Sequence, residues 1–144
     1  MNALREVLVA RRASETGAPL PRGRERLAMA YPSPYRAGMS SLGYQWVCSL
    51  LGEAGFGVER VFLPDDVDAW RRARVPPLSM ESHTPLGSFP LVCVSVAYEL
   101  ELAGLVELLR LAGIPPLRRD RGPAHPRVLV GGPLTFSNPM TCVP

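Results

Sequence analysis

Three loops carry the residues whose types could hold a ligand. They are Ser33-Pro34-Tyr35-Arg36-Ala37-Gly38-Met39-Ser40, Ser95-Val96-Ala97-Tyr98-Glu99 and Gly131-Gly132-Pro133, and each follows an apolar run. Serine hydroxyls and the free amides at a helix start can bind polar or anionic groups, and glycines let the backbone approach a bulky ligand. The same glycines are also ordinary turn residues, so each loop alone is a weak signal. The candidate binding residues are Ser33, Tyr35, Arg36, Gly38, Met39, Ser40, Ser95, Tyr98, Glu99, Gly131, Gly132 and Pro133.

The elements that must position these loops alternate between strand and helix. Short apolar runs predict strands over 27–31, 58–63, 91–96 and 127–130. Helices are predicted over about 41–54, from about 65 to 74 and over about 98–112. This alternation is typical of a doubly wound parallel sheet of the Rossmann-like or flavodoxin-like type. Ligands bind such α/β sheets beyond the carboxyl ends of the strands, where the three loops lie.

Some details of these elements can be predicted as well. The helix over 41–54 carries one apolar face, made of Leu42, Trp46, Leu50, Leu51 and Ala54. Residues 32–40 are expected to form a loop, and residues 133–144 contain no finished element. Because a parallel sheet needs a covering helix after its fourth strand and usually a fifth strand, we expect the domain to be incomplete at its C-terminal end. Residues 1–25 are expected to be a lead-in helix (2–12) and linker, and residues 26–144 one α/β domain.

Composition excludes several classes of protein. The net charge of the 144 residues is only +3, and all sixteen basic residues are arginines that are scattered along the chain. This distribution argues against a nucleic-acid-binding face, although arginine also suits oxyanion recognition. No apolar segment is long enough to cross a membrane or to serve as a signal peptide. Three cysteines without a C-x-x-C pair fit a cytoplasmic protein, with Cys48 and Cys93 as core residues.

Common catalytic motifs are missing from the sequence. A P-loop is impossible without lysine, and no G-x-G-x-x-G follows the first predicted strand. The stretch from Gly38 to Gly43 differs from a nucleophile elbow, because leucine stands at position 42 where that motif needs glycine. No catalytic residue and no set of metal ligands can therefore be named.

Taken together, the three loops resemble those of the N-terminal cobalamin-binding-like domain of radical SAM proteins. Cobalamin domains carry D-x-H-x-x-G after the first strand, S-x-L after the third and G-G after the fourth. Here Ser33-x-Tyr35-x-x-Gly38, Ser95-x-Ala97 and Gly131-Gly132 come in the same order. The chain resembles one subgroup of large radical SAM proteins over about residues 24–139, in the segments Tyr35–Gly43, Glu59–Phe62, Glu81-Ser82, Tyr98–Leu100 and Gly131–Pro133.

This resemblance implies a corrinoid-type or other small-molecule ligand at the strand ends. It also implies a partner, the radical SAM barrel domain, which would hold a 4Fe-4S cluster and S-adenosylmethionine; its C-x-x-x-C-x-x-C motif is absent here. Tyr35 occupies the place of the cobalt-ligating histidine, and Ser33 replaces the aspartate that orients it. A phenol stays protonated at neutral pH, so we expect cobalamin to bind without a protein axial ligand, or another ligand or none to bind instead.

Two functions remain open at this stage. The chain could be the ligand-binding N-terminal domain of a radical SAM enzyme, or a non-catalytic binding or scaffold module with a degenerate cobalamin site. Arg36 and Glu99 are expected either to face the barrel domain or to form a salt bridge with each other.

Overall fold

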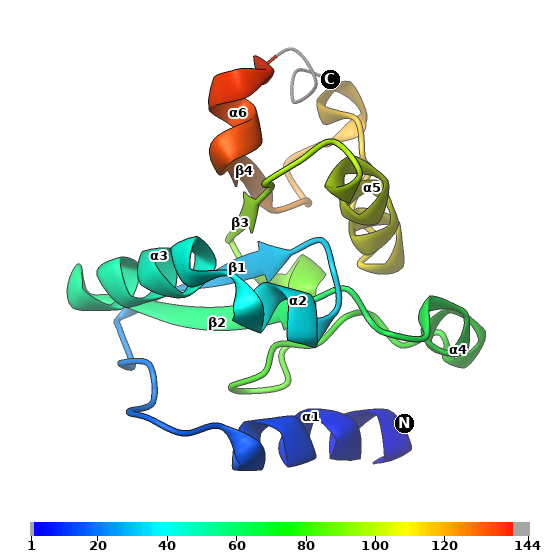
Figure 1. Cartoon of the computed structure of the whole chain (residues 1–144). Helices are drawn as coiled ribbons and strands as arrows, with labels where there is room; N and C mark the ends of the chain where they lie inside the picture. The colour runs from blue at the N-terminus through cyan, green and yellow to red at the C-terminus, as the bar shows by residue number, and fades with distance from the viewer. Residues whose placement is uncertain (1, 140–144) are drawn as a thin grey trace.

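Four parallel strands form a single sheet in the computed structural model, which describes residues 2–139. The sheet order is β2-β1-β3-β4, with β1 at Glu25–Tyr31, β2 at Phe56–Phe62, β3 at Leu91–Ser95 and β4 at Arg127–Gly131. Helical segments follow each strand (Figure 1), and these are α2 (Tyr35–Ser40) and α3 (Leu42–Glu53), α4 (Val67–Ala73), α5 (Glu101–Leu111) and α6 (Pro133–Ser137). The doubly wound α/β fold predicted from the sequence is confirmed.

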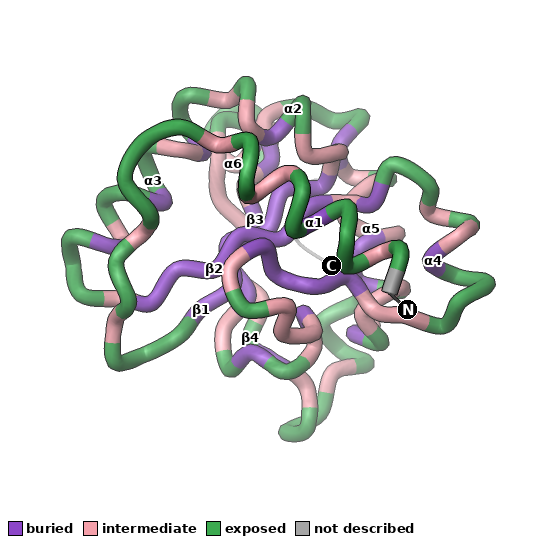
Figure 2. The backbone as a smooth tube through the Cα atoms, turned by 90° about the horizontal axis from the view of Figure 1, so that it is seen from below, coloured by how far each residue is buried: buried purple, intermediate pink, exposed green. Residues whose placement is uncertain are grey.

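Apolar packing covers both faces of the sheet at β1, β2 and β3, whereas β4 is only partly covered, with Leu129 59% exposed. Leu27 and Met29 of β1 join a cluster with α3, whereas Ala28 and Ala30 join a second cluster with α5 on the opposite face. Successive residues of a strand point to opposite faces, so one short apolar run supplies both clusters. Figure 2 shows β1 and β2 as buried along most of their length.

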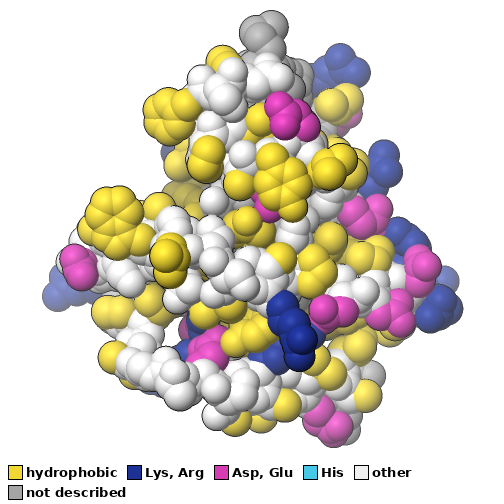
Figure 3. All heavy atoms as spheres, in the orientation of Figure 1, with side chains coloured by type: hydrophobic (Ala, Val, Ile, Leu, Met, Phe, Trp, Pro, Cys, Tyr) yellow, Lys and Arg dark blue, Asp and Glu magenta, His cyan; other side chains and the backbone are white. Residues whose placement is uncertain are grey.

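The predicted packing face of α3 was wrong. Leu42 is 80% exposed and Trp46 is 68% exposed, whereas Tyr44 and Cys48 are buried. The helix is apolar on most of its circumference, so periodicity alone does not choose a face. A hydrogen bond decides it, because the Tyr44 hydroxyl donates to the Met29 carbonyl at 2.8 Å inside the core. Figure 3 shows hydrophobic side chains gathered on the outer surface of α3.

Two short helices were missed by the sequence prediction. Residues 35–40 of the segment expected as a loop form α2, and Pro34 precedes the helix with an extended ψ of 159°. Proline fixes φ near its helical value and lacks the N–H that a helix start leaves free, so it is favoured as the first helical residue. Pro133 takes this position in α6, after Gly132 adopts a φ of 111°. Residues 140–144, and with them Cys142 and the expected incompleteness of the domain, lie outside the described residues.

The edge of β2 is covered by the segment between α4 and β3. The Met80 amide donates to the Arg60 carbonyl at 2.8 Å, and the Glu81 carboxylate accepts the Arg60 amide at 2.7 Å. These bonds satisfy backbone N–H and C=O groups of β2 that would otherwise lack a hydrogen-bond partner at the edge of the sheet. Short 3-10 turns, η1 (Leu86–Ser88) and η2 (Arg118–Asp120), lead into β3 and β4.

The chain begins with α1 (Asn2–Ser14), the expected lead-in helix. It packs through Leu8 on the cluster that contains Phe62 and Trp70. Within residues 2–139, no helix combines the length and the apolar character needed to cross a membrane.

Candidate functional site

The carboxyl ends of β1 and β3 form the candidate site. These two strands are neighbours in the sheet, yet the chain leaves β1 toward β2 on one side and leaves β3 toward β4 on the other. Such a reversal separates the loops that follow the two strands and is where open α/β sheets bind ligands. The loops after β1 and β3 are the first two loops that the sequence singled out.

The loop after β1 turns its aromatic side chain away from this junction. The Tyr35 hydroxyl donates to Glu15 at 2.9 Å, and its ring lies 5.3 Å from the Phe62 ring in an edge-to-face arrangement. Met39 lies on the same side, where the Arg60 guanidinium approaches its sulfur at 3.4 Å. Tyr35 and Met39 thus belong to a cluster on the β2 side of the sheet.

The remaining polar residues of this loop are closer to solvent. Ser33 is half-buried, whereas Arg36 and Ser40 are exposed. The Ser40 hydroxyl donates to the Arg36 carbonyl at 2.7 Å, a bond within the helix that leaves its oxygen free to accept. Among the residues that the structure describes, neither Arg36 nor Glu99 takes part in an ion pair, so the salt bridge considered between them is not formed.

Packing within the chain explains why glycine is needed at two of the three glycine positions in these loops. A Cβ atom on Gly38 would lie 2.4 Å from the Phe62 ring, and one on Gly132 would lie 2.4 Å from the Val96 carbonyl oxygen. Gly132 also adopts a positive φ, which favours glycine. Gly131 has open space where its Cβ would be. Only Gly131 therefore remains available for close approach of a ligand.

The loop after β3 presents its side chains outward. Ser95 is half-buried, and Tyr98 and Glu99 are exposed. Pro133, at the start of α6, is exposed as well, and the next residue, Leu134, packs with the α5 cluster. The predicted residues therefore do not converge on one cavity: Tyr35 and Met39 lie on the β2 side, and the others line the ends of β1, β3 and β4.

Glu101 is the residue at this junction that the sequence analysis missed. It is 3% exposed, and its carboxylate accepts the Ala97 amide at 2.6 Å. It also lies beside the Tyr31 hydroxyl at the end of β1, and burial together with this carboxylate raises the pKa of Tyr31 to about 12. A buried carboxylate and a phenol thus meet where β1 and β3 end. An acid in the first turn of a helix is usually explained by the helix dipole. The sequence therefore did not mark Glu101 as a functional residue.

The donor set does not fit protein ligation of cobalt. Burial and the neighbouring Glu15 carboxylate raise the pKa of Tyr35, so its phenol remains protonated at neutral pH. The same hydroxyl is committed as a donor to Glu15. Within residues 2–139, no group of three or more histidine, cysteine or acidic side chains is arranged to hold a metal ion.

Comparison with known proteins places the chain in one family. The family model for the N-terminal part of radical SAM proteins matches residues 43–144, from the first turn of α3 onward. No curated protein and no solved structure matches the chain. The matched segment contains β2, β3 and β4 and the loops after β3 and β4. The resemblance that the loops indicated is therefore confirmed at the level of the family, and the chain belongs to the family of radical SAM proteins, N-terminal.

Proposed function

We propose that this chain is the ligand-binding N-terminal module of a radical SAM enzyme, with its ligand at the carboxyl ends of β1 and β3. The observation that supports this proposal is the Glu101 carboxylate beside the Tyr31 hydroxyl, both buried at the point where the sheet order reverses. A group whose pKa is shifted by burial and a charged neighbour, as that of Tyr31 is, is more frequent at functional sites than elsewhere. The ligand would contact the exposed groups around this pair.

A corrinoid is the ligand class that the family resemblance suggests for this surface. Since Tyr35 is engaged with Glu15, the cobalt would receive no ligand from this chain. Ser33, Ser95 and Gly131 would then contact the periphery of the ring. The downstream catalytic domain of the parent protein would supply the iron–sulfur cluster and S-adenosylmethionine, since cofactors of this kind carry the chemistry and the protein positions them.

A titration with cobalamin tests this proposal. Hydroxocobalamin and cob(II)alamin would be added to the protein, and binding would be followed by calorimetry and by electron paramagnetic resonance of cob(II)alamin. We expect saturable binding with a spectrum that shows no new nitrogen or oxygen ligand from the protein. Glu101→Gln should weaken binding, whereas Glu53→Gln, an exposed acid at the end of α3, should change it little. Absence of binding at high cobalamin concentration would exclude the corrinoid.

A second candidate function is a scaffold module that binds no small molecule. It is favoured by Tyr35, Gly38 and Gly132, because each position is engaged by a contact within the chain itself. Such a module would position the catalytic domain through its surface alone. It predicts that Glu101→Gln leaves association with the catalytic domain intact, and that the protein purified from cells carries no bound cofactor.

A further inference from the structure

The Glu15 carboxylate sits in an unusually complete binding site on the β2 side of the sheet. The Arg60 guanidinium donates two parallel hydrogen bonds to it, Nη1 to Oε1 and Nη2 to Oε2, both 2.8 Å long. The Tyr35 hydroxyl donates to Oε1 at 2.9 Å, and Arg12 donates to Oε2 at 2.7 Å. One carboxylate therefore accepts four hydrogen bonds, in the bidentate geometry by which arginine recognises carboxylates.

Arg60 is held in place without the help of Glu15. It is 6% exposed, and its Nε donates to Glu81 at 2.8 Å. Glu81 in turn accepts the Arg60 amide, which fixes the carboxylate to the edge of β2. If Glu15 moved away, the guanidinium would keep its orientation and its two Nη groups would be free. A preorganised buried cation of this kind is suited to bind another carboxylate.

A cavity next to this carboxylate provides room for a small molecule. Its volume is about 380 Å³, which lies in the range of small-molecule sites. Tyr35, Arg60 and Cys48 form part of its wall. Its polar lining comprises Gln45 and Ser49 of α3, and Ser14 and Thr16 on either side of Glu15 itself. The amide of Gln45 and the hydroxyl of Ser49 stay in place when Glu15 leaves, and they can bind the remainder of a polar organic acid whose carboxylate takes the position of Glu15.

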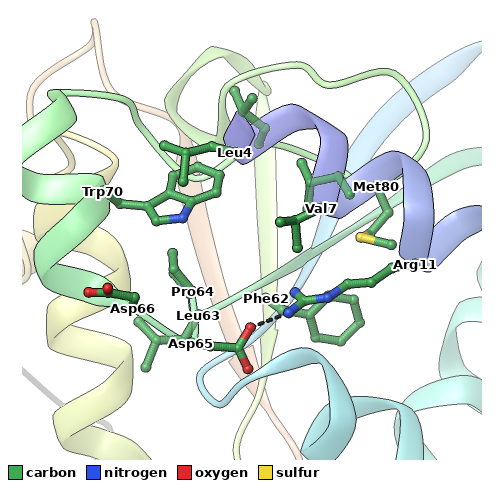
Figure 4. A pocket seen from close by; sticks show the side chains of 12 residues that line it. Leu4, Val7, Arg11, Phe62, Leu63, Pro64, Asp65, Asp66, Trp70 and Met80 are labelled. Carbon is green, nitrogen blue, oxygen red and sulfur yellow. Dashed lines mark hydrogen bonds and ion pairs between the residues drawn. The ribbon is translucent and has the colours of Figure 1, made fainter. Parts of the chain in front are cut away.

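Apart from the ion pairs of Arg11 and Glu15, few apolar contacts attach the segment 2–24 to the domain. Leu8 is buried, and Leu4 and Leu20 are partly buried against the same cluster. A cavity of about 270 Å³ lies between α1 and Trp70. Figure 4 shows the side chains that line it, with Arg11 of α1 paired with Asp65. Residues 15–24 contain no helix and only bends before β1. Releasing α1 would therefore break few apolar contacts.

We propose that the Arg60 pocket binds the carboxylate of a small organic acid and that Glu15 is the internal occupant which this acid displaces. α1 and the residues up to Glu15 form a strap over the pocket, and binding releases the strap. This site lies apart from the β1/β3 junction and does not depend on the ligand proposed there. Glu15 lies outside the segment matched by the family model, whereas Arg60, Glu81 and Gln45 lie inside it.

The first test empties the pocket. Glu15→Ala removes the internal carboxylate, and binding of acetate and glycolate would be measured by calorimetry and by the thermal unfolding midpoint at constant ionic strength. We expect saturable binding at least about tenfold tighter than to the unchanged protein, because charge-assisted hydrogen bonds become available. Acetamide should not bind. Glu6→Ala, an exposed acid on α1, is the matched control and should behave like the unchanged protein.

The second test asks whether the strap moves in the unchanged protein. Trypsin cleavage after Arg11 and Arg12 would be followed by mass spectrometry with rising glycolate concentration, and with chloride at the same ionic strength. We expect glycolate to increase cleavage and chloride to have no such effect. Arg60→Gln should abolish the response to glycolate. This test also shows whether an organic acid displaces Glu15 if the Glu15→Ala variant fails to fold.

Two results would overturn the proposal. Folded Glu15→Ala protein that binds acetate no better than Glu6→Ala would show that the pocket is not a carboxylate site. Binding without any glycolate-dependent release of the strap in the unchanged protein would make Glu15 a permanent structural partner. Neither result would affect the cobalamin titration, since that test concerns residues at the β1/β3 junction.

Discussion

The backbone of Gly104 in α5 lies against the carbonyl oxygen of Pro32, so closely that a Cβ atom on Gly104 would be 2.0 Å from that oxygen. This contact joins the helix after β3 to the loop after β1, beside the buried Glu101. The geometry of the β1/β3 junction therefore depends on a position that has no side chain.

We expect Gly104→Ala to destabilise the protein by about 1–3 kcal/mol, because overpacking against rigid backbone forces the helix to shift. Gly43→Ala is the control: Gly43 lies in α3, and its Cβ would meet no atom within 4 Å. Alanine there should stabilise the protein by about 0.5–1 kcal/mol through its higher helix propensity. Urea unfolding of the two variants measures both effects, and equal changes would show that the close contact does not matter.

The sequence was sufficient to predict the strands but not the packing face of α3. Short runs such as Leu91–Ser95 are apolar at nearly every position. Such runs are typical of strands in a parallel sheet that is buried on both faces. In α3, both faces are apolar, and the buried one follows from the Tyr44 hydroxyl bonding to Met29. That bond joins residues 15 positions apart, and no periodicity encodes it.

The sequence predicted where the loops of the candidate site lie, but not the contacts of all their side chains. The strand-end rule located the loops correctly, since parallel strands end on the same side of the sheet. Tyr35 was assigned to this site from its place in a motif, yet Glu15, 20 residues earlier, holds its hydroxyl. Glu101 was missed because an acid at a helix start already has an ordinary explanation. The contacts of Tyr35 with Glu15 and of Glu101 with Tyr31 join residues far apart in the chain, and no local pattern encodes them.

The edge of β2 gives a second prediction, which concerns Glu81. Its carboxylate accepts the amide and the Nε of Arg60. Glu81→Ala leaves a buried guanidinium with half of its partners and should cost about 3–5 kcal/mol. Glu81→Gln keeps one acceptor oxygen and should cost less. Glu53→Ala, at the exposed end of α3, is the control and should change the free energy of unfolding by less than about 0.5 kcal/mol.

Acid stability provides a test of the Glu15 site. Burial alone would raise the pKa of Glu15, but hydrogen bonds from Arg60, Arg12 and Tyr35 hold it below the ordinary value of 4.5. A carboxylate with a lowered pKa stabilises the folded state above its unfolded pKa, and this stabilisation is lost as the pH falls through the folded pKa. Burial raises the pKa of Glu81, which works in the opposite direction.

Glu15→Gln should therefore be less stable than the unchanged protein at neutral pH, and the difference should shrink as the pH falls below 4.5 toward the lowered pKa of Glu15 in the folded protein. Chemical unfolding across this pH range measures the difference directly. Glu6→Gln should give a curve parallel to that of the unchanged protein. A difference between Glu15→Gln and the unchanged protein that stays constant with pH would mean that the ionised carboxylate is not what Arg60 stabilises.

The two buried cysteines should resist chemical modification in the folded protein. Burial raises the pKa of Cys48 to about 12 and also raises that of Cys93. The reactive species is the thiolate, so both burial and a raised pKa slow alkylation. We expect iodoacetamide to modify these two residues on the order of a hundredfold more slowly in the native state than in urea. Peptide mass spectrometry follows each site separately. Fast labelling of Cys48 in buffer would show that α3 separates from the sheet, because Cys48 lies on the face of α3 that packs beside Met29.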